Sequence, residues 1–262
     1  MHRSAPPLLL ILCVLAGSPA RAVERGDAFD AARQRAGVWL GAGLLRNQLA
    51  FEASNADLQT TVEGVPALSV GADLWASEQF GLYAGATVGL STQLELPSQG
   101  VALRYNTHHF EAGARSRWHL GPGTDALALF AGLGLRATLQ TAQVQRPSLL
   151  VDTTAVGPEL QAGLEVPVLG SRFWLRATVR AGLPFYVRES PDDSGDADRF
   201  WAVGGRFEAV VGLSGRLHAV LLADAVSQHL QFRGEGTRAG AVFDGRADDL
   251  LLTGTVGVRY GL

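Results

Sequence analysis

The sequence has no lysine, a single cysteine, and no long apolar run beyond its first residues. All 22 basic residues are arginine, and the formal net charge is -3. A weakly acidic chain argues against nucleic acid as a partner, because nucleic-acid-binding proteins use basic surfaces to neutralise phosphates. After Ala22 no stretch reaches the roughly 18 continuous apolar residues of a membrane-spanning helix. The charge balance therefore argues against a nucleic-acid-binding protein, and the lack of long apolar runs argues against a helical membrane protein.

The lone cysteine lies in a segment with the layout of a secretory signal. Arg3 precedes the apolar run Leu8 to Ala16, and Ala20-Arg21-Ala22 is a small-residue cleavage site. The run is too short to anchor the chain as a helix. Cys13 follows Leu12, whereas a lipoprotein signal would place a small residue there. We predict that residues 1–22 are removed on export and that the remaining chain has no cysteine and no disulfide.

From residue 36 onward, apolar residues alternate with polar residues or glycine, and turn signals separate the repeats. A period of two is typical of a strand with two unlike faces. In the segment 126–140, Leu127, Leu133 and Leu139 share one face, whereas Gly134 and Arg136 lie on the other. We count ten such segments and predict strands at about 36–50, 58–76, 80–96, 101–119, 126–145, 153–169, 172–189, 199–213, 217–232 and 248–262.

The connections between these segments alternate in length. Those at 77–79, 120–125, 170–171 and 214–216 are short, whereas those at 51–57, 146–152, 190–198 and 233–247 are longer and more polar; 97–100 breaks the trend. Short turns at one end and long loops at the other are typical of bacterial outer-membrane barrels. We predict an all-β fold: a closed antiparallel up-and-down transmembrane β-barrel of ten strands, with eight or twelve as alternatives.

Alternation alone does not say which face is outside, because a soluble lipocalin-type barrel would turn its apolar face inward. The aromatic residues favour the membrane arrangement. Phe80, Trp118, Phe173 and Tyr260 lie on the apolar face next to short turns, where an aromatic girdle is expected. Phe185 and Trp201 are candidates for the girdle at the other membrane surface.

The last residues resemble the C-terminal assembly signal of outer-membrane β-barrels. Thr255, Gly257, Tyr260 and Leu262 fill its polar, glycine and two hydrophobic positions, with leucine where most such signals end in phenylalanine. Residues 36–262 resemble the outer-membrane β-barrel superfamily, at the size of OmpA- and OmpX-like barrels or omptins. The resemblance implies insertion by the barrel-assembly machinery with periplasmic chaperones, and contact with outer-membrane lipid and lipopolysaccharide. Residues 23–35 are predicted to be a short periplasmic leader.

The inward face is predicted to carry a nearly balanced set of charges. These residues are Asp73, Glu111, Arg115, Arg117, Arg136, Glu159, Glu165, Arg176, Arg180, Arg206, Glu208, Asp224 and Arg259. Unpaired buried charges cost several kcal/mol each, so mutual pairing is expected, and the planar guanidinium can bind carboxylates through two bonds. We predict a lumen plugged by ion pairs. The alternative is a small-solute pore lined by arginines.

Catalytic residues are harder to find. Omptin proteases resemble this chain in strand number and use acids with a His-Asp pair near the outer rim. Here the candidates are loop acids (Asp192, Asp193, Asp196, Asp198) and strand histidines (His108, His109, His229), and no spacing joins them. Adjacent His108 and His109 point to opposite faces of a strand and do not share a metal. In the exported chain no histidine is followed two residues later by serine, the pair that outer-membrane lipid A deacylases use.

We therefore predict no catalytic residue, no cofactor and no metal site. The expected role is a structural or surface-interaction protein of the outer membrane whose loops 51–57, 190–198 and 233–247 face outward. A pore or transporter is the first alternative, and a protease or lipid hydrolase at the outer rim is the second.

Overall fold

The computed structural model describes residues 33, 35–90, 92–96, 101–121, 126–143 and 148–262. The predicted signal peptide and most of the predicted leader lie outside these residues, so both remain predictions. Within the described residues no helix is long and apolar enough to cross a membrane.

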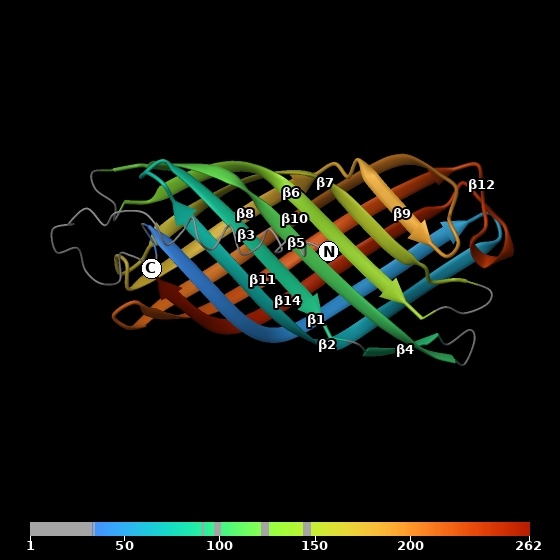
Figure 1. Ribbon diagram of the computed structural model, residues 1–262, viewed down its shortest axis with the longest axis horizontal. Helices are drawn as coiled ribbons and strands as arrows, with labels where there is room; N and C mark the ends of the chain where they lie inside the picture. The colour runs from blue at the N-terminus through green and yellow to red at the C-terminus, as the bar shows by residue number, and fades with distance from the viewer. Residues whose placement is uncertain (1–32, 34, 91, 97–100, 122–125, 144–147) are drawn as a thin grey trace, which may run out of the picture.

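The chain forms one antiparallel sheet that closes on itself, with the barrel axis running horizontally in Figure 1. Its strands are β1 (Ala36–Ala53), β2 (Ala56–Trp75), β3 (Phe80–Gly89), β4 (Thr92–Leu96), β5 (Val101–His119), β6 (Ala128–Ala142), β7 (Asp152–Pro167), β8 (Phe173–Gly182), β9 (Tyr186–Ser190), β10 (Asp196–Ser214), β11 (Leu217–Arg233) and β14 (Arg246–Gly261). Neighbours in the sequence pair with each other, and β1 pairs with β14 to complete the ring. The predicted fold class is confirmed.

Two strands of the barrel wall are each interrupted. Both β3 and β4 pair with β5, and both β8 and β9 pair with β7, so each of these two pairs of segments forms one wall strand. The second interruption contains Pro184, which has no N–H to donate to a ladder. The wall therefore has ten strands, and the alternatives of eight and twelve are wrong.

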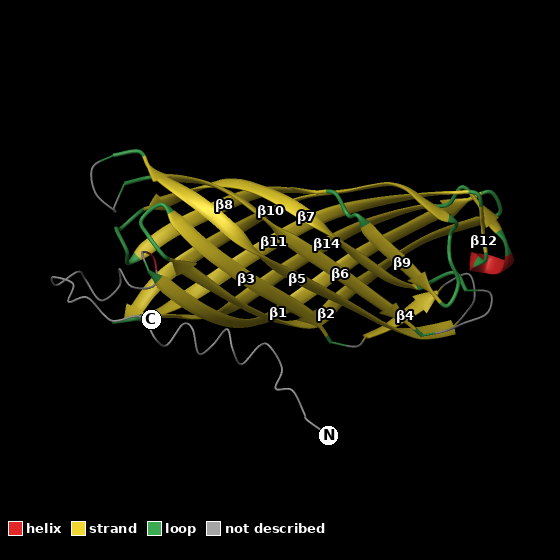
Figure 2. Cartoon of the chain, turned by 45° about the horizontal axis from the view of Figure 1, so that its top comes forward, coloured by secondary structure: helices red, strands yellow, loops and turns green. Residues whose placement is uncertain are grey.

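The two ends of the barrel differ in their connections (Figure 2). At the end with the C-terminus, β2 and β3 are joined by a tight turn in which the Ser77 hydroxyl accepts a 3.0 Å hydrogen bond from the Phe80 amide. Gly215 completes another tight turn with a φ of 51°. The opposite end has the long connection from β11 to β14, which contains β12 (Glu235–Gly236), the 3-10 turn η1 (Arg238–Gly240) and β13 (Val242–Phe243).

One predicted outer loop is wrong. Strands β1 and β2 continue to Ala53 and Ala56, so only Ser54 and Asn55 form the connection predicted to span 51–57. The inward side chains of this stretch, Phe51 and Leu58, are buried. Its charged residues, Glu52 and Asp57, lie on the outward face of the projecting strands and give this stretch the polarity of a loop.

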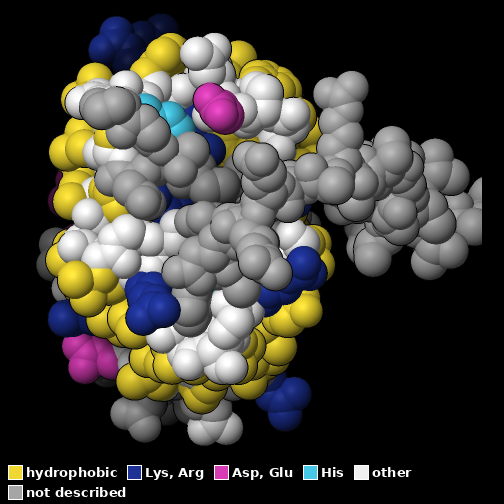
Figure 3. All heavy atoms as spheres, turned by 90° about the vertical axis from the view of Figure 1, so that its left-hand side faces the viewer, with side chains coloured by type: hydrophobic (Ala, Val, Ile, Leu, Met, Phe, Trp, Pro, Cys, Tyr) yellow, Lys and Arg dark blue, Asp and Glu magenta, His cyan; other side chains and the backbone are white. Residues whose placement is uncertain are grey.

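Large apolar side chains on the outward face form a belt around the barrel. Its members include Val38, Leu40, Leu68, Val70, Phe110, Leu133, Leu135, Leu160, Val179, Val203, Phe207 and Val256, each at least 40 % exposed. Phe80, Trp118 and Tyr260 are exposed near the C-terminal end, Phe173 is half-buried, and Phe185 and Trp201 are exposed toward the other end. Hydrophobic side chains also line the circumference of the end shown in Figure 3. This is the membrane arrangement.

The polarity of the wall reverses above the belt. The strands β1 and β2 have 18 and 20 residues, about twice the 9–11 that cross a bilayer. In their outer halves outward side chains are polar, as at Gln48 and Thr61, whereas most of the inward ones are apolar. The inward group forms a core of Leu45, Leu49, Phe51, Leu58, Val62, Val65, Ala67, Leu103, Tyr105, Leu150, Val242 and Leu251. The projecting section is therefore built like a water-soluble barrel.

Candidate functional site

The charged residues predicted to face the lumen all lie inside the barrel wall. Their side chains are at most 15 % exposed, and the least buried are Arg206, Glu208 and Asp224. They come from eight strands, because the period of two turns every second side chain of each strand inward. They form two clusters of ion pairs, which follow one another along the barrel axis.

The first cluster is centred on Asp73 of β2. Arg259 of β14 donates a hydrogen bond of 2.8 Å to its carboxylate, Arg115 of β5 binds the other oxygen, and Arg176 of β8 approaches to 3.5 Å. Three guanidinium groups from three strands thus meet one carboxylate across the lumen. This contact ties together parts of the wall that are not neighbours in the sheet.

Arg176 continues this cluster toward the C-terminal end of the barrel. It donates hydrogen bonds of 2.8 and 3.2 Å to Glu165 and lies 3.3 Å from Glu208. Glu165 also binds Nε of Arg33 at 2.8 Å. Arg33 belongs to the predicted leader and is fully buried, so part of the leader enters the mouth of the barrel.

Arg117 holds Arg33 in place from the wall. It donates a hydrogen bond of 3.2 Å to the Arg33 carbonyl, and its guanidinium lies 3.9 Å from the centre of the Trp75 ring. This role of Arg33 could not be predicted from the sequence, because a single arginine in a polar leader has no period to relate it to the wall. Neither Arg33 nor Trp75 was among the predicted lumen residues.

The second cluster lies nearer the outer end and forms a ring of four residues. Glu111 and Asp224 each bind both Arg180 and Arg206. The distances include 3.0 Å from Arg180 to Glu111 and 2.8 Å from Nε of Arg206 to Asp224. Beside the ring, Arg136 lies 3.5 Å from Glu159. All predicted lumen residues are therefore in, or next to, one of the two clusters.

Little space remains between these side chains. A cavity lined by Asp73, Glu111 and Arg180 measures about 30 Å³. Two others nearer the outer end measure about 20 and 10 Å³. A water molecule needs about 10–15 Å³ of such space, so each of these cavities has room for one or two waters at most. The charged section is a packed interior.

Comparison with known proteins gives only distant likenesses. No family model and no curated protein matches the sequence. Among solved structures, the outer membrane protein OprG from Pseudomonas aeruginosa has a TM-score of 0.37 and 10 % identity, with 87 % of this chain and 98 % of that one covered. The β domain of the Bordetella autotransporter BrkA has a TM-score of 0.38 and 17 % identity, covering 87 % and 100 %. Ail of Yersinia pestis has a TM-score of 0.34 and 7 % identity, covering 87 % and 99 %.

These TM-scores are too low to assign a protein class to this chain. The class follows from the architecture of the chain itself. Ten antiparallel strands close into a ring with an apolar belt outside and buried charges inside. The chain has the architecture of a transmembrane β-barrel. Because an open sheet edge is not tolerated in hydrocarbon, closure by β1 and β14 is what allows this sheet to span the membrane.

The outer end of this barrel is closed by a cap of loop residues. Arg238 of η1 lies with its guanidinium 3.6 Å from the Phe51 ring centre and donates a 2.6 Å hydrogen bond to the Leu149 carbonyl. It also contacts Glu189 and Ser194 at 3.3 Å. Burial raises the pKa of Glu189, which lies in this cap above the belt, and the Arg238 guanidinium opposes that shift.

The residues considered for catalysis are dispersed over the barrel. His109 is buried in the lumen, whereas His108 lies on the other face of β5. Asp193 accepts hydrogen bonds from the amides of Gly195 and Thr237 within the loops. In the described part of the chain no group of three or more histidine, cysteine and acidic residues is arranged to hold a metal ion.

One histidine does meet an acid. Nδ1 of His229 lies 2.6 Å from Oδ1 of Asp248, and the His229 ring stacks on Trp201 with centroids 5.2 Å apart. The sequence named His229 as a candidate but not Asp248 or Trp201 as its partners. Only the strand register reveals these partners, because His229 is the direct cross-strand neighbour of both Trp201 and Asp248. This group lies on the outside of the wall above the belt, away from the lumen.

Proposed function

We propose that this barrel is a sealed, non-enzymatic outer-membrane protein that anchors and presents an ordered surface above the membrane. The observation that carries the proposal is the filling of the lumen at three successive levels. Arg33 occupies the periplasmic mouth, ion pairs fill the section inside the belt, and an apolar core fills the projecting section. A barrel filled in this way does not suit a pore.

The outer connections support the presenting role. The loop between β9 and β10 is joined to the loop between β11 and β14 by the Asp193 and Thr237 contacts and by the bonds of Arg238 to Glu189 and Ser194. Two connections that are far apart in the sequence thus form one surface. Because loops on a rigid scaffold commonly carry binding function, a partner is expected to bind here.

The test is the conductance of residues 23–262 refolded and inserted into planar bilayers. Folding is verified first by the shift in electrophoretic mobility between heated and unheated samples. We expect no steady channel events from the folded protein. Steady, ion-selective current would contradict the sealed lumen and would favour the arginine-lined pore instead.

We further propose the route by which the chain reaches the membrane. Cleavage after Ala22 would release the chain to periplasmic chaperones, and the C-terminal residues Thr255, Gly257, Tyr260 and Leu262 would direct insertion by the assembly machinery. The N-terminal sequence of the membrane-embedded protein tests the cleavage. A mature chain that does not begin at Val23 would contradict it.

A further inference from the structure

The wall of the projecting section is open along one seam. Closer to the membrane, β2 pairs with β3 over Ala67–Trp75, and the Leu90 amide donates a further hydrogen bond of 2.8 Å to the Pro66 carbonyl. Beyond this point β4 pairs with β5 and not with β2, although both lie at the outer end of the barrel (Figure 1). Among the described residues, β1 is therefore the only strand that pairs with the Ala56–Val65 stretch of β2.

The ladder between β1 and β2 decides which backbone groups face this seam. The connection between the two strands has two residues, so the flanking Ala53 and Ala56 form a hydrogen-bonded pair. In an antiparallel ladder such pairs alternate with pairs that are not bonded to each other. Asp57, Gln59 and Thr61 belong to the second kind, so their amides and carbonyls point away from β1. Three donors and three acceptors of β2 thus line the seam.

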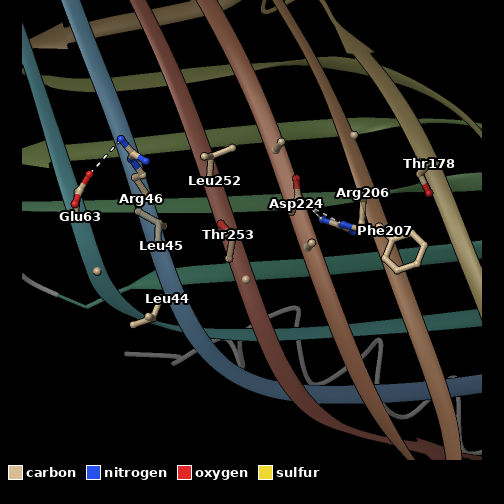
Figure 4. A pocket seen from close by; sticks show the side chains of 15 residues that line it. Leu44, Leu45, Arg46, Glu63, Thr178, Arg206, Phe207, Asp224, Leu252 and Thr253 are labelled. Carbon is tan, nitrogen blue, oxygen red and sulfur yellow. Dashed lines mark hydrogen bonds and ion pairs between the residues drawn. The ribbon is translucent and has the colours of Figure 1, made fainter.

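Proteins commonly protect an exposed strand edge with prolines, bulges or charges. Near the membrane β2 has the first two of these devices. Pro66 has no N–H, and a β-bulge places Glu63 and Gly64 opposite Arg46. Figure 4 shows Arg46 and Glu63, whose side chains lie 3.1 Å apart. From Asp57 to Val62 the edge has neither proline nor bulge, so another strand can pair with it.

Neither this chain's own leader nor a second copy fits the edge. The leader reaches Arg33, which is bound at the opposite end of the barrel. Two barrels in one membrane are related by rotation about the membrane normal, which leaves β2 of both copies running in the same sense. Because the strands of such barrels are tilted by about 35–45°, the two edges would cross instead of lying alongside each other. The added strand therefore comes from a molecule outside the cell.

The charges beside the seam indicate what this strand carries. Asp57 is exposed on the outward face, and its cross-strand neighbour on β1 is a second exposed acid, Glu52. Like charges directly opposite each other destabilise a sheet. The neighbour of Glu52 on β14 is Arg246, which donates a 2.7 Å hydrogen bond to Asp248. A lysine or arginine on an added strand would become the second direct neighbour of Asp57 and would offset the repulsion.

We propose that the β2 edge binds an extended, basic segment of an extracellular protein as an additional strand. The segment pairs antiparallel with β2, as β1 and β3 do. Its basic side chains point outward beside Asp57, and the alternate ones are apolar and point inward, toward the core that contains Leu58 and Val62. Main-chain hydrogen bonds supply the affinity and the alternate side chains supply the specificity. This edge is a second binding surface, in addition to the loop surface proposed above.

The experiment measures the binding of a labelled peptide of alternating lysine and valine to residues 23–262 in nanodiscs of zwitterionic lipid, by fluorescence anisotropy. Empty nanodiscs give the background. In antiparallel pairing the lysine amides face β2, whereas the valine amides face away from it. N-methylation of the lysine amides should therefore abolish binding, and N-methylation of the valine amides should leave it intact.

Two variants of the barrel test the same edge. Asp57→Lys should weaken binding about tenfold, because a repulsion replaces an attraction between cross-strand neighbours. Gln59→Pro removes an amide that faces the seam, so it should abolish binding while the hydrogen bonds to β1 remain. The matched control is Asp196→Lys, which makes the same charge change at an exposed residue of β10. It should leave binding unchanged.

Equal binding of the two methylated peptides would overturn the inference. An equal loss in Asp57→Lys and Asp196→Lys would also overturn it, because the peptide would then respond only to the overall charge. The peptide comparison uses the unaltered barrel, so misfolding of Gln59→Pro leaves the test intact. A barrel that is silent in planar bilayers and does not bind the peptide would refute this inference alone and leave the sealed lumen in place.

Discussion

Removing Arg176 should destabilise the barrel more than any change to a surface arginine. Its side chain is 2 % exposed and serves three carboxylates, Glu165, Glu208 and Asp73. Substitution by methionine keeps most of the volume but leaves these acids without their shared cation. Breaking a buried ion pair by removing one partner costs about 3–5 kcal/mol, because the remaining charge is buried and uncompensated. We expect the free energy of unfolding of Arg176→Met to be lower than that of the wild type by an amount in this range.

The assay is urea unfolding in lipid vesicles, followed by tryptophan fluorescence. Arg199→Ala is the control, because its guanidinium is 74 % exposed and lies 3.9 Å from Asp198; its expected cost is below about 1 kcal/mol. Adding Glu165→Gln to Arg176→Met should recover part of the loss, since one stranded charge is then neutral. A stability of Arg176→Met within about 1 kcal/mol of wild type would refute the view that the network holds the wall together.

Three further outcomes are expected. Arg33→Ala should release this part of the leader from Glu165, so proteinase K, which does not need an arginine, should cleave residues 23–35 faster in the folded protein, whereas unchanged cleavage would mean that the mouth contact is not maintained. Arg238→Ala should loosen the cap and speed surface proteolysis at residues 191–195 of whole cells, and equal rates would count against the cap. Leu262→Phe should raise the fraction of folded protein in outer-membrane extracts by improving the assembly signal, and a lower fraction would contradict that reading of the C-terminus.

The strands could be predicted because a wall between lipid and a polar lumen imposes a period of two. That period located all ten wall strands within a few residues, and it turned the predicted charges inward. It could not show which charges meet, because Asp73 and Arg259, or Glu111 and Arg180, lie on strands that are not neighbours. Those pairs are set by the diameter and tilt of the closed barrel.

The errors have separate physical causes. Above the membrane the same alternation continues with its polarity reversed, since water replaces lipid outside the wall. Polar residues such as Glu52 and Asp57 then belong to strands, although they read as a loop in the sequence. Arg33 escaped prediction because its position depends on a fitting acid, Glu165, at the mouth of the finished barrel.

The central claim is that the lumen is sealed, and thiol labelling tests it most directly. The predicted mature chain has no cysteine, so single cysteines report one position each. Ser69 lies inside the wall and is 1 % exposed, whereas Ser227 lies on the outward face of β11. In the folded barrel in vesicles, a membrane-impermeant maleimide should label the Ser227→Cys variant and leave the Ser69→Cys variant unmodified until urea unfolds it. Labelling of Ser69→Cys at the rate of Ser227→Cys would show an open, water-filled lumen and would contradict the sealed barrel.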